Sequence, residues 1–311
     1  MRIVIVGAGG AGGYFGARWA QAGLDVTLVA RGGHVAAIQA SGLRIESPLG
    51  SATVRVRAVQ AGEAVEPADV IVVATKCWQL EGAIETLGPL LHGSTMVFGI
   101  QNGVEAAEVL ARSVDPSNVL GGTCRIISYV HEPGVVRHLG IEPVVAFGEL
   151  SGGVSPRAAD LESALDLGAT VKATASGDIV AEIWKKFLFF APVSGVGSVA
   201  RAPIGVLRAQ PETHRLLTSA VREVHAVALA AGVDLPPGSV EDTLAFIDSI
   251  PAAGTSSLQR DFEDGRRTEL EALAGAVRRI GERYRVPTPV HDFVYAALLP
   301  LERRAHGAVE W

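Results

Sequence analysis

The chain has 311 residues, of which 48% are hydrophobic and 19% are charged, and its formal net charge is −6 at pH 7. This length suits two domains, each with its own core, and the negative charge argues against nucleic acid or an anionic membrane as the main partner. Two cysteines provide no disulfide framework. The sequence contains neither a signal peptide nor a run of about 20 apolar residues, so we expect a cytoplasmic protein outside the membrane.

The first half alternates short β-branched apolar runs with helical stretches. The runs at 2–7, 25–30, 69–74 and 95–100 predict parallel strands buried on both faces. Crossover helices are expected between these strands, over 11–23 and 78–91. The alternation predicts an α/β fold, a Rossmann-type doubly wound sheet.

A glycine motif of the form G-x-G-x-x-G directly follows the first strand and opens the first helix. In that context the first glycine permits a tight turn, the second lets the backbone approach a pyrophosphate, and the third lets the helix pack closely on the strand. The amides at the helix N-terminus then bind the phosphates. The predicted cofactor-binding residues of this loop are Gly7, Ala8, Gly9, Gly10, Ala11 and Gly12.

The end of the second strand indicates which dinucleotide is used. NAD-selecting enzymes carry an acid there for the ribose 2′-hydroxyl, whereas this chain has Ala30 and Arg31. A guanidinium suits a 2′-phosphate. Lys76, after the third strand, supplies a second cation for the same phosphate or the adenine edge. The prediction is NADPH/NADP⁺, and the alternative for Arg31 is an ordinary surface arginine.

From about residue 120 the pattern changes to antiparallel strands over 119–140 and 143–150, with a closing strand over 169–175. Beyond Asp178 nearly everything is helical, which predicts an all-α C-terminal domain. The predicted domains are 1–175, binding NADP, and 176–311, helical and catalytic. The expected helices are 179–200, 211–231, 238–249, 255–264, 268–285 and 289–304.

Two adjacent lysines, Lys185 and Lys186, lie in the apolar helix 179–200 and point about 100° apart. One can extend to water, and the other needs a role. Reducing a ketone with hydride leaves an alkoxide, which needs a proton donor or a fixed positive charge. The alternative for Lys186 is an i,i+4 ion pair with Glu182. The residues alone favour neither the catalytic role of Lys186 nor its ion pair with Glu182.

Three further residues have both a functional and a structural interpretation. Asn102 follows the fourth strand at the ligand-binding edge of the sheet, although Asn-Gly is also a common turn. Glu269 is expected in the first turn of a helix that starts with a Thr268–Glu271 capping box, where the helix dipole alone favours a carboxylate. Ser257 precedes a helix, where serines are usually caps.

Taken together, these motifs resemble the ketopantoate reductase (2-dehydropantoate 2-reductase) family over almost the whole chain. The matching motifs, in family order, are the glycine loop, TKCWQ (75–79), QNG (101–103), EIWKK (182–186), SSLQRD (256–261) and RTELEALAG (267–275). The resemblance implies NADPH-dependent reduction of a 2-oxo acid, as in pantothenate biosynthesis. It implies that Lys186 and Glu269 are the catalytic residues, with Glu269 helping to hold substrate or cofactor. It also implies that Ser257 hydrogen-bonds the substrate and that Asn102 contacts both substrate and cofactor.

The substrate half departs from the family at two positions. Members that reduce ketopantoate typically carry asparagines four and eight residues after the catalytic lysine, where this chain has Phe190 and Ser194. These two residues should line one wall of the substrate site with Lys186. The prediction is therefore a 2-oxo acid that is more apolar or bulkier than ketopantoate.

Two alternatives stay open: an imine- or opine-forming NADPH reductase, and a non-catalytic NADP(H)-binding sensor on the same fold. No metal is expected, because the histidines and cysteines lack zinc-site spacing. The sequence leaves open the exact substrate and whether the protein forms a homodimer.

Overall fold

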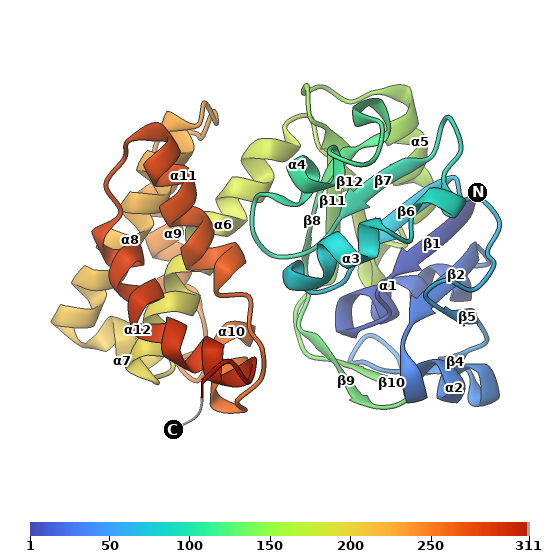
Figure 1. Ribbon diagram of the computed structural model, residues 1–311, viewed down its shortest axis with the longest axis horizontal. Coiled ribbons are helices and arrows are strands. Elements are labelled where there is room, and N and C mark those ends of the chain that lie inside the picture. Colours follow the sequence, from blue (N-terminus) through green and yellow to red (C-terminus); the bar gives the residue numbers. More distant parts are fainter. Residues whose placement is uncertain (310–311) are drawn as a thin grey trace. The chain divides into compact units, whose positions relative to one another are not determined.

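The computed structural model describes residues 1–309, which divide into two compact units (Figure 1). The first unit comprises Met1–Gln101 and Ala106–Ile179. The second comprises the segment Asn102–Glu105 and the chain from Val180 onward. The sequence placed a single boundary between residues 175 and 176 and did not anticipate the short excursion at 102–105.

A five-stranded parallel sheet forms the centre of the first unit, with the strand order β5-β2-β1-β6-β7 (Figure 1). This confirms the predicted Rossmann-type doubly wound sheet. Alternate residues of a strand face opposite sides, so Ile3 and Ile5 enter one core while Val4 and Val6 enter another. The strands are β1 (Arg2–Val6), β2 (Asp25–Ala30), β5 (Arg57–Gln60), β6 (Val70–Val73) and β7 (Met96–Gly99).

Helix α1 (Gly10–Gln21) covers one face of this sheet, and its Tyr14, Phe15 and Trp19 are fully buried beside the side chains of Ile3 and Ile5. Other helical elements of the first unit include α2 (Gly32–Ser41), α4 (Ala106–Leu110), α5 (Pro156–Leu165) and the 3₁₀ turns η3 (Pro116–Asn118) and η4 (Gly168–Thr170).

The crossover helix predicted over 78–91 is wrong as a single helix. The chain forms a 3₁₀ turn η1 (Cys77–Gln79), a short helix α3 (Leu80–Ile84) and a second 3₁₀ turn η2 (Gly88–Leu90). Glycine lowers helix propensity, and Pro89 disfavours the α conformation in the residue before it. The Gly88-Pro89 pair therefore ends the helical run early.

Two smaller sheets complete the first unit. One has the order β4-β3-β10-β9 and the other the order β12-β11-β8. The β9–β10 and β8–β11 pairs are antiparallel, as predicted, whereas the closing strand β12 runs parallel to β11. The sequence missed the strands between residues 43 and 60. The strands are β3 (Leu43–Glu46), β4 (Ala52–Val54), β8 (Leu120–Arg125), β9 (Ser128–Glu132), β10 (Val135–His138), β11 (Val144–Glu149) and β12 (Lys172–Ala175).

The second unit is helical, as predicted, and its core is made mainly by apolar side chains of α6, α8, α9 and α11, with contributions from α7 and α10. Helix α7 was not predicted from the sequence. The helices are α6 (Ile179–Ala200), α7 (Ile204–Ala209), α8 (Pro211–Ala230), α9 (Ser239–Ser249), α10 (Ser257–Glu263), α11 (Ala276–Tyr284) and α12 (Pro289–Ala305).

The helix predicted over 268–285 begins later and irregularly, because a π-helical turn, η5 (Glu271–Gly275), precedes α11. Single π turns are frequent at functional sites.

The predicted capping box is wrong. The Thr268 hydroxyl donates to Glu302 and accepts a hydrogen bond from the Leu270 N–H group at 3.1 Å. The Glu271 carboxylate pairs with Arg279 instead of returning to Thr268. Glu269 therefore lies in the irregular turn before the helix.

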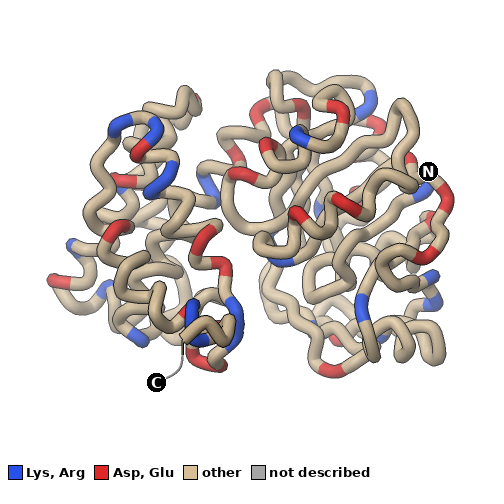
Figure 2. The backbone as a smooth tube through the Cα atoms, in the orientation of Figure 1, with Lys and Arg blue, Asp and Glu red and all other residues tan. Residues whose placement is uncertain are grey.

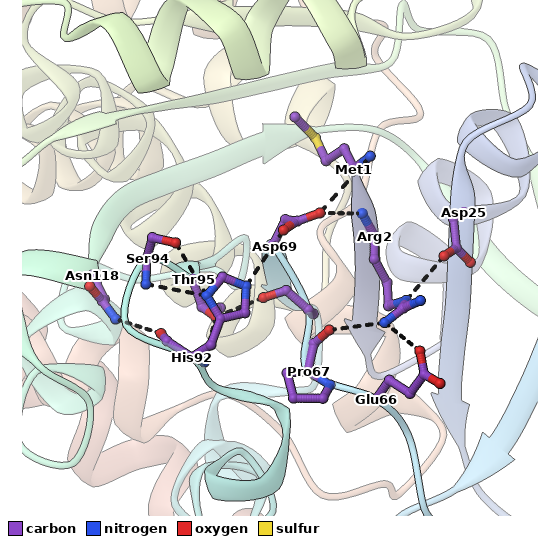
Figure 3. A network of polar contacts seen from close by, with 11 residues as sticks. Met1, Arg2, Asp25, Glu66, Pro67, Asp69, His92, Ser94, Thr95 and Asn118 are labelled. Carbon is purple, nitrogen blue, oxygen red and sulfur yellow. Dashed lines mark hydrogen bonds and ion pairs between the residues drawn. The ribbon is translucent and has the colours of Figure 1, made fainter.

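A polar network joins the amino ends of the parallel strands (Figure 3). The Arg2 backbone N–H donates to Asp69 at 2.7 Å, and the Arg2 guanidinium pairs with Asp25 and Glu66. His92 lies 3.5 Å from the second Asp69 oxygen. The hydrogen bond from the Arg2 backbone holds the pKa of the Asp69 carboxyl below its usual range. These contacts tie β1 to the starts of its neighbours β2 and β6.

Candidate functional site

The loop between β1 and α1 has the geometry that the glycine motif requires. Gly7 adopts φ +106°, and a Cβ atom there would lie 2.7 Å from the Thr75 backbone nitrogen. The Gly7 and Ala8 N–H groups donate to the Val29 carbonyl at 2.9 and 3.2 Å, which ties the loop to the end of β2. A Cβ atom at Gly9 would meet no atom within 4 Å, so open space lies beside the backbone at that position.

Helix α1 starts directly at this open space. Gly9 is its N-cap and provides no capping side chain, and the first turn contains no acidic residue. The Gly13 N–H is bonded to the Gly9 carbonyl at 2.8 Å, so the amides of residues 10–12 precede the regular hydrogen-bond ladder. Such amides, together with the positive end of the helix dipole, form an anion-binding position.

Two other glycines of the motif are required for packing. A Cβ atom at Gly12 would lie 2.2 Å from the Gly7 carbonyl oxygen, so the helix approaches the strand closely, as predicted. A Cβ atom at Gly10 would lie 2.3 Å from the Ser128 carbonyl oxygen of β9. Gly10 thus has a packing role that the motif alone did not reveal.

Arg31 and Lys76 follow the two strands that flank β1 in the sheet order. Arg31 follows β2 as the exposed N-cap residue of α2. Lys76 is half-buried and follows β6, where its N–H donates to the Gln79 side chain at 3.3 Å. Parallel strands bring their carboxyl ends to one edge, so the glycine loop and both cations belong to the same edge of the sheet.

His34 is a residue of this region that the sequence reasoning missed. Its Nδ1 accepts the Gly134 N–H at 3.0 Å, which joins α2 to the β9–β10 turn. The neutral ring then carries its proton on Nε2, which is buried and has no hydrogen-bond partner in the described chain. Burial lowers the pKa of His34, and the Ala8 backbone offsets part of this shift. The only signal in the sequence is the position of His34, three residues after Arg31.

In the second unit, Asn102 and Glu269 meet although 167 positions separate them. The Asn102 Nδ2 donates to the Glu269 Oε2 at 2.9 Å, and Glu269 is only 5% exposed. A buried carboxylate is costly unless it is hydrogen-bonded, so this contact fixes both side chains.

The segment Asn102–Glu105 is held in place by the helical unit. Glu105 forms an ion pair with Arg279 of α11 at 2.7 Å, and Val104 packs against the helical core. Gly103 has φ +93°, and a Cβ atom there would lie 2.9 Å from the carbonyl oxygen of Ala272 in the π turn. The Asn-Gly pair thus serves both as a turn and as a close contact beside the buried Glu269.

The two lysines of α6 differ as their 100° separation suggests. Lys185 is exposed and pairs with Glu182 at 2.9 Å, so the alternative Glu182–Lys186 ion pair is wrong. Lys186 is half-buried, and its ammonium lies 5.8 Å from the centre of the Phe190 ring. Within residues 1–309 the Lys186 ammonium forms no ion pair and no hydrogen bond. It is a partly buried cation one helical turn from an aromatic ring.

Phe190 and Ser194 follow Lys186 at helical spacing but differ in exposure. Phe190 is half-buried and lies 6.3 Å from Phe189, edge to face. Ser194 is fully buried, and its hydroxyl has no hydrogen-bond partner in the described part of the chain. A buried hydroxyl without a partner is unusual in proteins.

At α10 the cap is Ser256 rather than Ser257. The Ser256 hydroxyl accepts the Gln259 N–H at 3.1 Å. Ser257 is the first residue of the helix, is half-buried, and forms no hydrogen bond through its hydroxyl among the described residues. Ser257 therefore has no capping role.

Charged residues of both signs are interspersed along both units (Figure 2). In the part of the chain that the structure describes, no group of three or more His, Cys, Asp or Glu side chains is placed to hold a metal ion. No helix between residues 1 and 309 combines the length and apolar character needed to cross a membrane.

Comparison with known proteins agrees with these motifs. The family model "Ketopantoate reductase PanE/ApbA" matches residues 3–152, and "Ketopantoate reductase PanE/ApbA C terminal" matches residues 178–302. The 2-dehydropantoate 2-reductase of Mesorhizobium japonicum is 32% identical over 333 residues, which cover 99% of this chain and 100% of that protein.

Two solved structures are similar over nearly the full length. The ketopantoate reductase of Ralstonia eutropha has a TM-score of 0.89 and 28% identity, covering 98% of this chain and 100% of the other. A D-mandelate dehydrogenase, solved with NADH and anilino(oxo)acetate, has a TM-score of 0.89 and 25% identity, covering 98% and 99%. Because the family models match both units and a full-length relative exceeds 30% identity, the chain belongs to the ketopantoate reductase family and is an oxidoreductase that acts on a ketone or the corresponding alcohol.

Proposed function

We propose that this protein reduces a 2-oxo acid to the 2-hydroxy acid with NADPH. The observation that carries the proposal is Lys186, a half-buried ammonium without an ion-pair partner among the described residues, at the position of the family's catalytic lysine.

The glycine loop fits a dinucleotide. The open space beside Gly9 leaves room for a pyrophosphate, and the amides of residues 10–12 lie at the N-terminus of α1. When bound, the nicotinamide cofactor supplies the hydride. Gly7, Gly9 and the first turn of α1 would hold its phosphates.

NADPH is favoured over NADH by the residues that follow β2. Arg31 is exposed there, and no acid occupies the position that would bind a ribose 2′-hydroxyl. A guanidinium can form two parallel hydrogen bonds with a phosphate, whereas it gains little from a hydroxyl. Lys76 adds positive charge at the same edge of the sheet. The similar D-mandelate dehydrogenase was solved with NADH, so both cofactors need to be tested on this chain.

The helical unit would bind and protonate the ketone. Lys186 would donate a proton to the developing alkoxide or stabilise its charge, because a positioned ammonium favours the negative charge that develops on the oxygen. Glu269 orients the Asn102 amide at 2.9 Å, and this amide, with the Ser257 hydroxyl, would hold the polar end of the substrate.

Phe190 favours a substrate with an apolar or aromatic group. A phenylalanine offers no hydrogen bond to the hydroxyl of ketopantoate, and a buried hydroxyl without a partner costs about 1–3 kcal/mol. The Ser194 hydroxyl is fully buried and has no partner among the described residues, so it presents no accessible group that would compensate. The ligand named with D-mandelate dehydrogenase, anilino(oxo)acetate, is an aromatic 2-oxo acid derivative, which agrees with this class.

Two other functions stay as alternatives. An imine- or opine-forming reductase would use the same cofactor loop, and a non-catalytic NADP(H) sensor would use it without turnover. Lys186 favours chemistry over sensing, because a sensor needs no half-buried lysine that lacks an ion-pair partner among the described residues of its helical unit.

A turnover screen tests the proposal. Purified protein is mixed with NADPH or NADH and with ketopantoate, 2-oxoisovalerate or phenylglyoxylate, each with and without ammonium. We expect NADPH oxidation with at least one 2-oxo acid and no dependence on ammonium. Oxidation only with ammonium or an amine would identify the imine-type reductase, and tight NADPH binding without oxidation of any compound would favour the sensor.

A further inference from the structure

An arginine is buried near the end of α1 without a carboxylate partner. Arg18 is only 4% exposed. It donates to the Gln21 side chain at 3.0 Å and to the Gly50 carbonyl, and it lies 5.2 Å from the centre of the Tyr14 ring. All three partners are neutral, and no carboxylate between residues 1 and 309 pairs with it. Buried arginines are rarely left without a carboxylate partner. Arg18 has no such counter-ion among the described residues.

The guanidinium is also incompletely hydrogen-bonded. It has five N–H donors, and its Nε–H is buried with no acceptor in the described chain. A purely structural role has some support, since a cation in the last turn of a helix interacts with the dipole and Tyr14 adds a cation–π contact. Neither contact supplies a full negative charge.

Arg18 lines an open cavity of about 320 Å³. The cavity lies within the first unit, between the end of α1, the β3–β4 turn and the segment around η4. Its other lining residues include Gln21, Ala22, Leu49, Leu167 and Thr170. Ala22, Leu49 and Leu167 are apolar, and Arg18 is the only charged residue among the lining residues.

We propose that this cavity binds a small organic acid, with its carboxylate on Arg18 and a short apolar body against Leu49 and Leu167. The planar guanidinium matches a carboxylate, and a single cation balances a monoanion better than a phosphate dianion. The volume lies at the lower end of the range for small-molecule sites.

This site is separate from the glycine loop. The loop lies at the first residue of α1 and Arg18 in its last turn, and the 12-residue helix is about 18 Å long. The proposal does not rest on the proposed reductase function, because it concerns only residues of the first unit that the reaction does not use.

Thermal unfolding of the full chain with butyrate as the probe tests the site, with butyramide as the uncharged control of the same shape and inorganic phosphate as the dianion. We expect butyrate to raise Tm in a saturable way, on the order of 5 °C, in the native protein. The same shift is expected in Lys186→Met, which excludes binding at the proposed substrate site. Butyramide and phosphate should have no such effect, and Arg18→Met should lose the butyrate shift.

A saturable butyrate shift that survives Arg18→Met would overturn the proposal, as would stabilisation by phosphate alone or no butyrate shift in the native protein. Leu49→Trp provides an independent variant in case Arg18→Met does not fold. It fills the cavity and keeps Arg18, so loss of the butyrate shift supports the site and an unchanged shift contradicts it.

Discussion

The glycine loop and the helical site are built in different ways. The loop presents backbone amides and open space beside Gly9 within one strand–turn–helix segment. The helical site depends on side chains from distant positions, such as Asn102 and Glu269, which meet only in the folded unit. A loop that presents its backbone through closely packed glycines tolerates few substitutions. A site lined by side chains can change residue by residue with the substrate. The chain accordingly retains the family's glycine motif but carries Phe190 and Ser194 in the substrate half.

The largest expected effect is a loss of turnover without a loss of cofactor affinity. Lys186→Ala should lower kcat by roughly 10²–10⁴-fold, since a positioned acid is removed, while NADPH affinity stays unchanged. Lys185→Ala is the matched control on the same helix and should be mild, because Lys185 is exposed and pairs with Glu182. Steady-state kinetics and NADPH titration measure both. A larger loss in Lys185→Ala would show that the helix face was assigned wrongly.

A smaller effect is expected on the choice between NADPH and NADH. Arg31→Ala should weaken NADPH binding by about 1.5–3 kcal/mol, typical of a lost charged hydrogen bond, and leave NADH binding nearly unchanged. Fluorescence titration of both cofactors measures this difference. Equal affinities of the native protein for NADPH and NADH would contradict the role of Arg31.

Two neighbouring serines of α10 allow stability and substrate binding to be separated. Ser256→Ala should lower the free energy of unfolding by about 1 kcal/mol, because Ser256 caps the helix. Ser257→Ala should leave that free energy unchanged and raise KM for the 2-oxo acid. Urea unfolding and kinetics on both variants test the assignment. If Ser257→Ala changed only stability, Ser257 would be a structural residue.

The smallest expected effect is on the free energy of unfolding and concerns Asp69 in the polar network of Figure 3. The folded-state pKa of Asp69 is lowered, so its contribution is complete above its unfolded pKa of about 4 and is lost as the pH falls through the folded value. Asp69 is half exposed, so solvent screening limits the contribution to roughly 0.5–1 kcal/mol. In urea unfolding, Asp69→Asn should be less stable than native protein at pH 7, and the difference should shrink near pH 3. The exposed Asp160→Asn serves as the control, and a difference that grew on acidification would contradict the assigned sign.

The parallel sheet, the glycine loop and most helices could be predicted, because each is encoded by local periodicity and glycine spacing. The strands between residues 43 and 60 could not, because short edge segments such as Ala52–Val54 carry little pattern. The Glu269 environment was also missed. The sequence suggested a capping box, but the competing partner of Thr268 is Glu302, 34 positions away. Tertiary contacts of this kind leave no local signal.

The substrate half is tested most directly by comparing kcat/KM for ketopantoate and phenylglyoxylate in the native protein and in Phe190→Asn, both with NADPH. We expect the native protein to prefer phenylglyoxylate. The Phe190→Asn variant should shift the ratio toward ketopantoate by about 5- to 150-fold, the equivalent of 1–3 kcal/mol for one buried hydroxyl. If ketopantoate is already the better substrate and Phe190→Asn does not improve it, Phe190 is a tolerated substitution and the proposed substrate class is wrong.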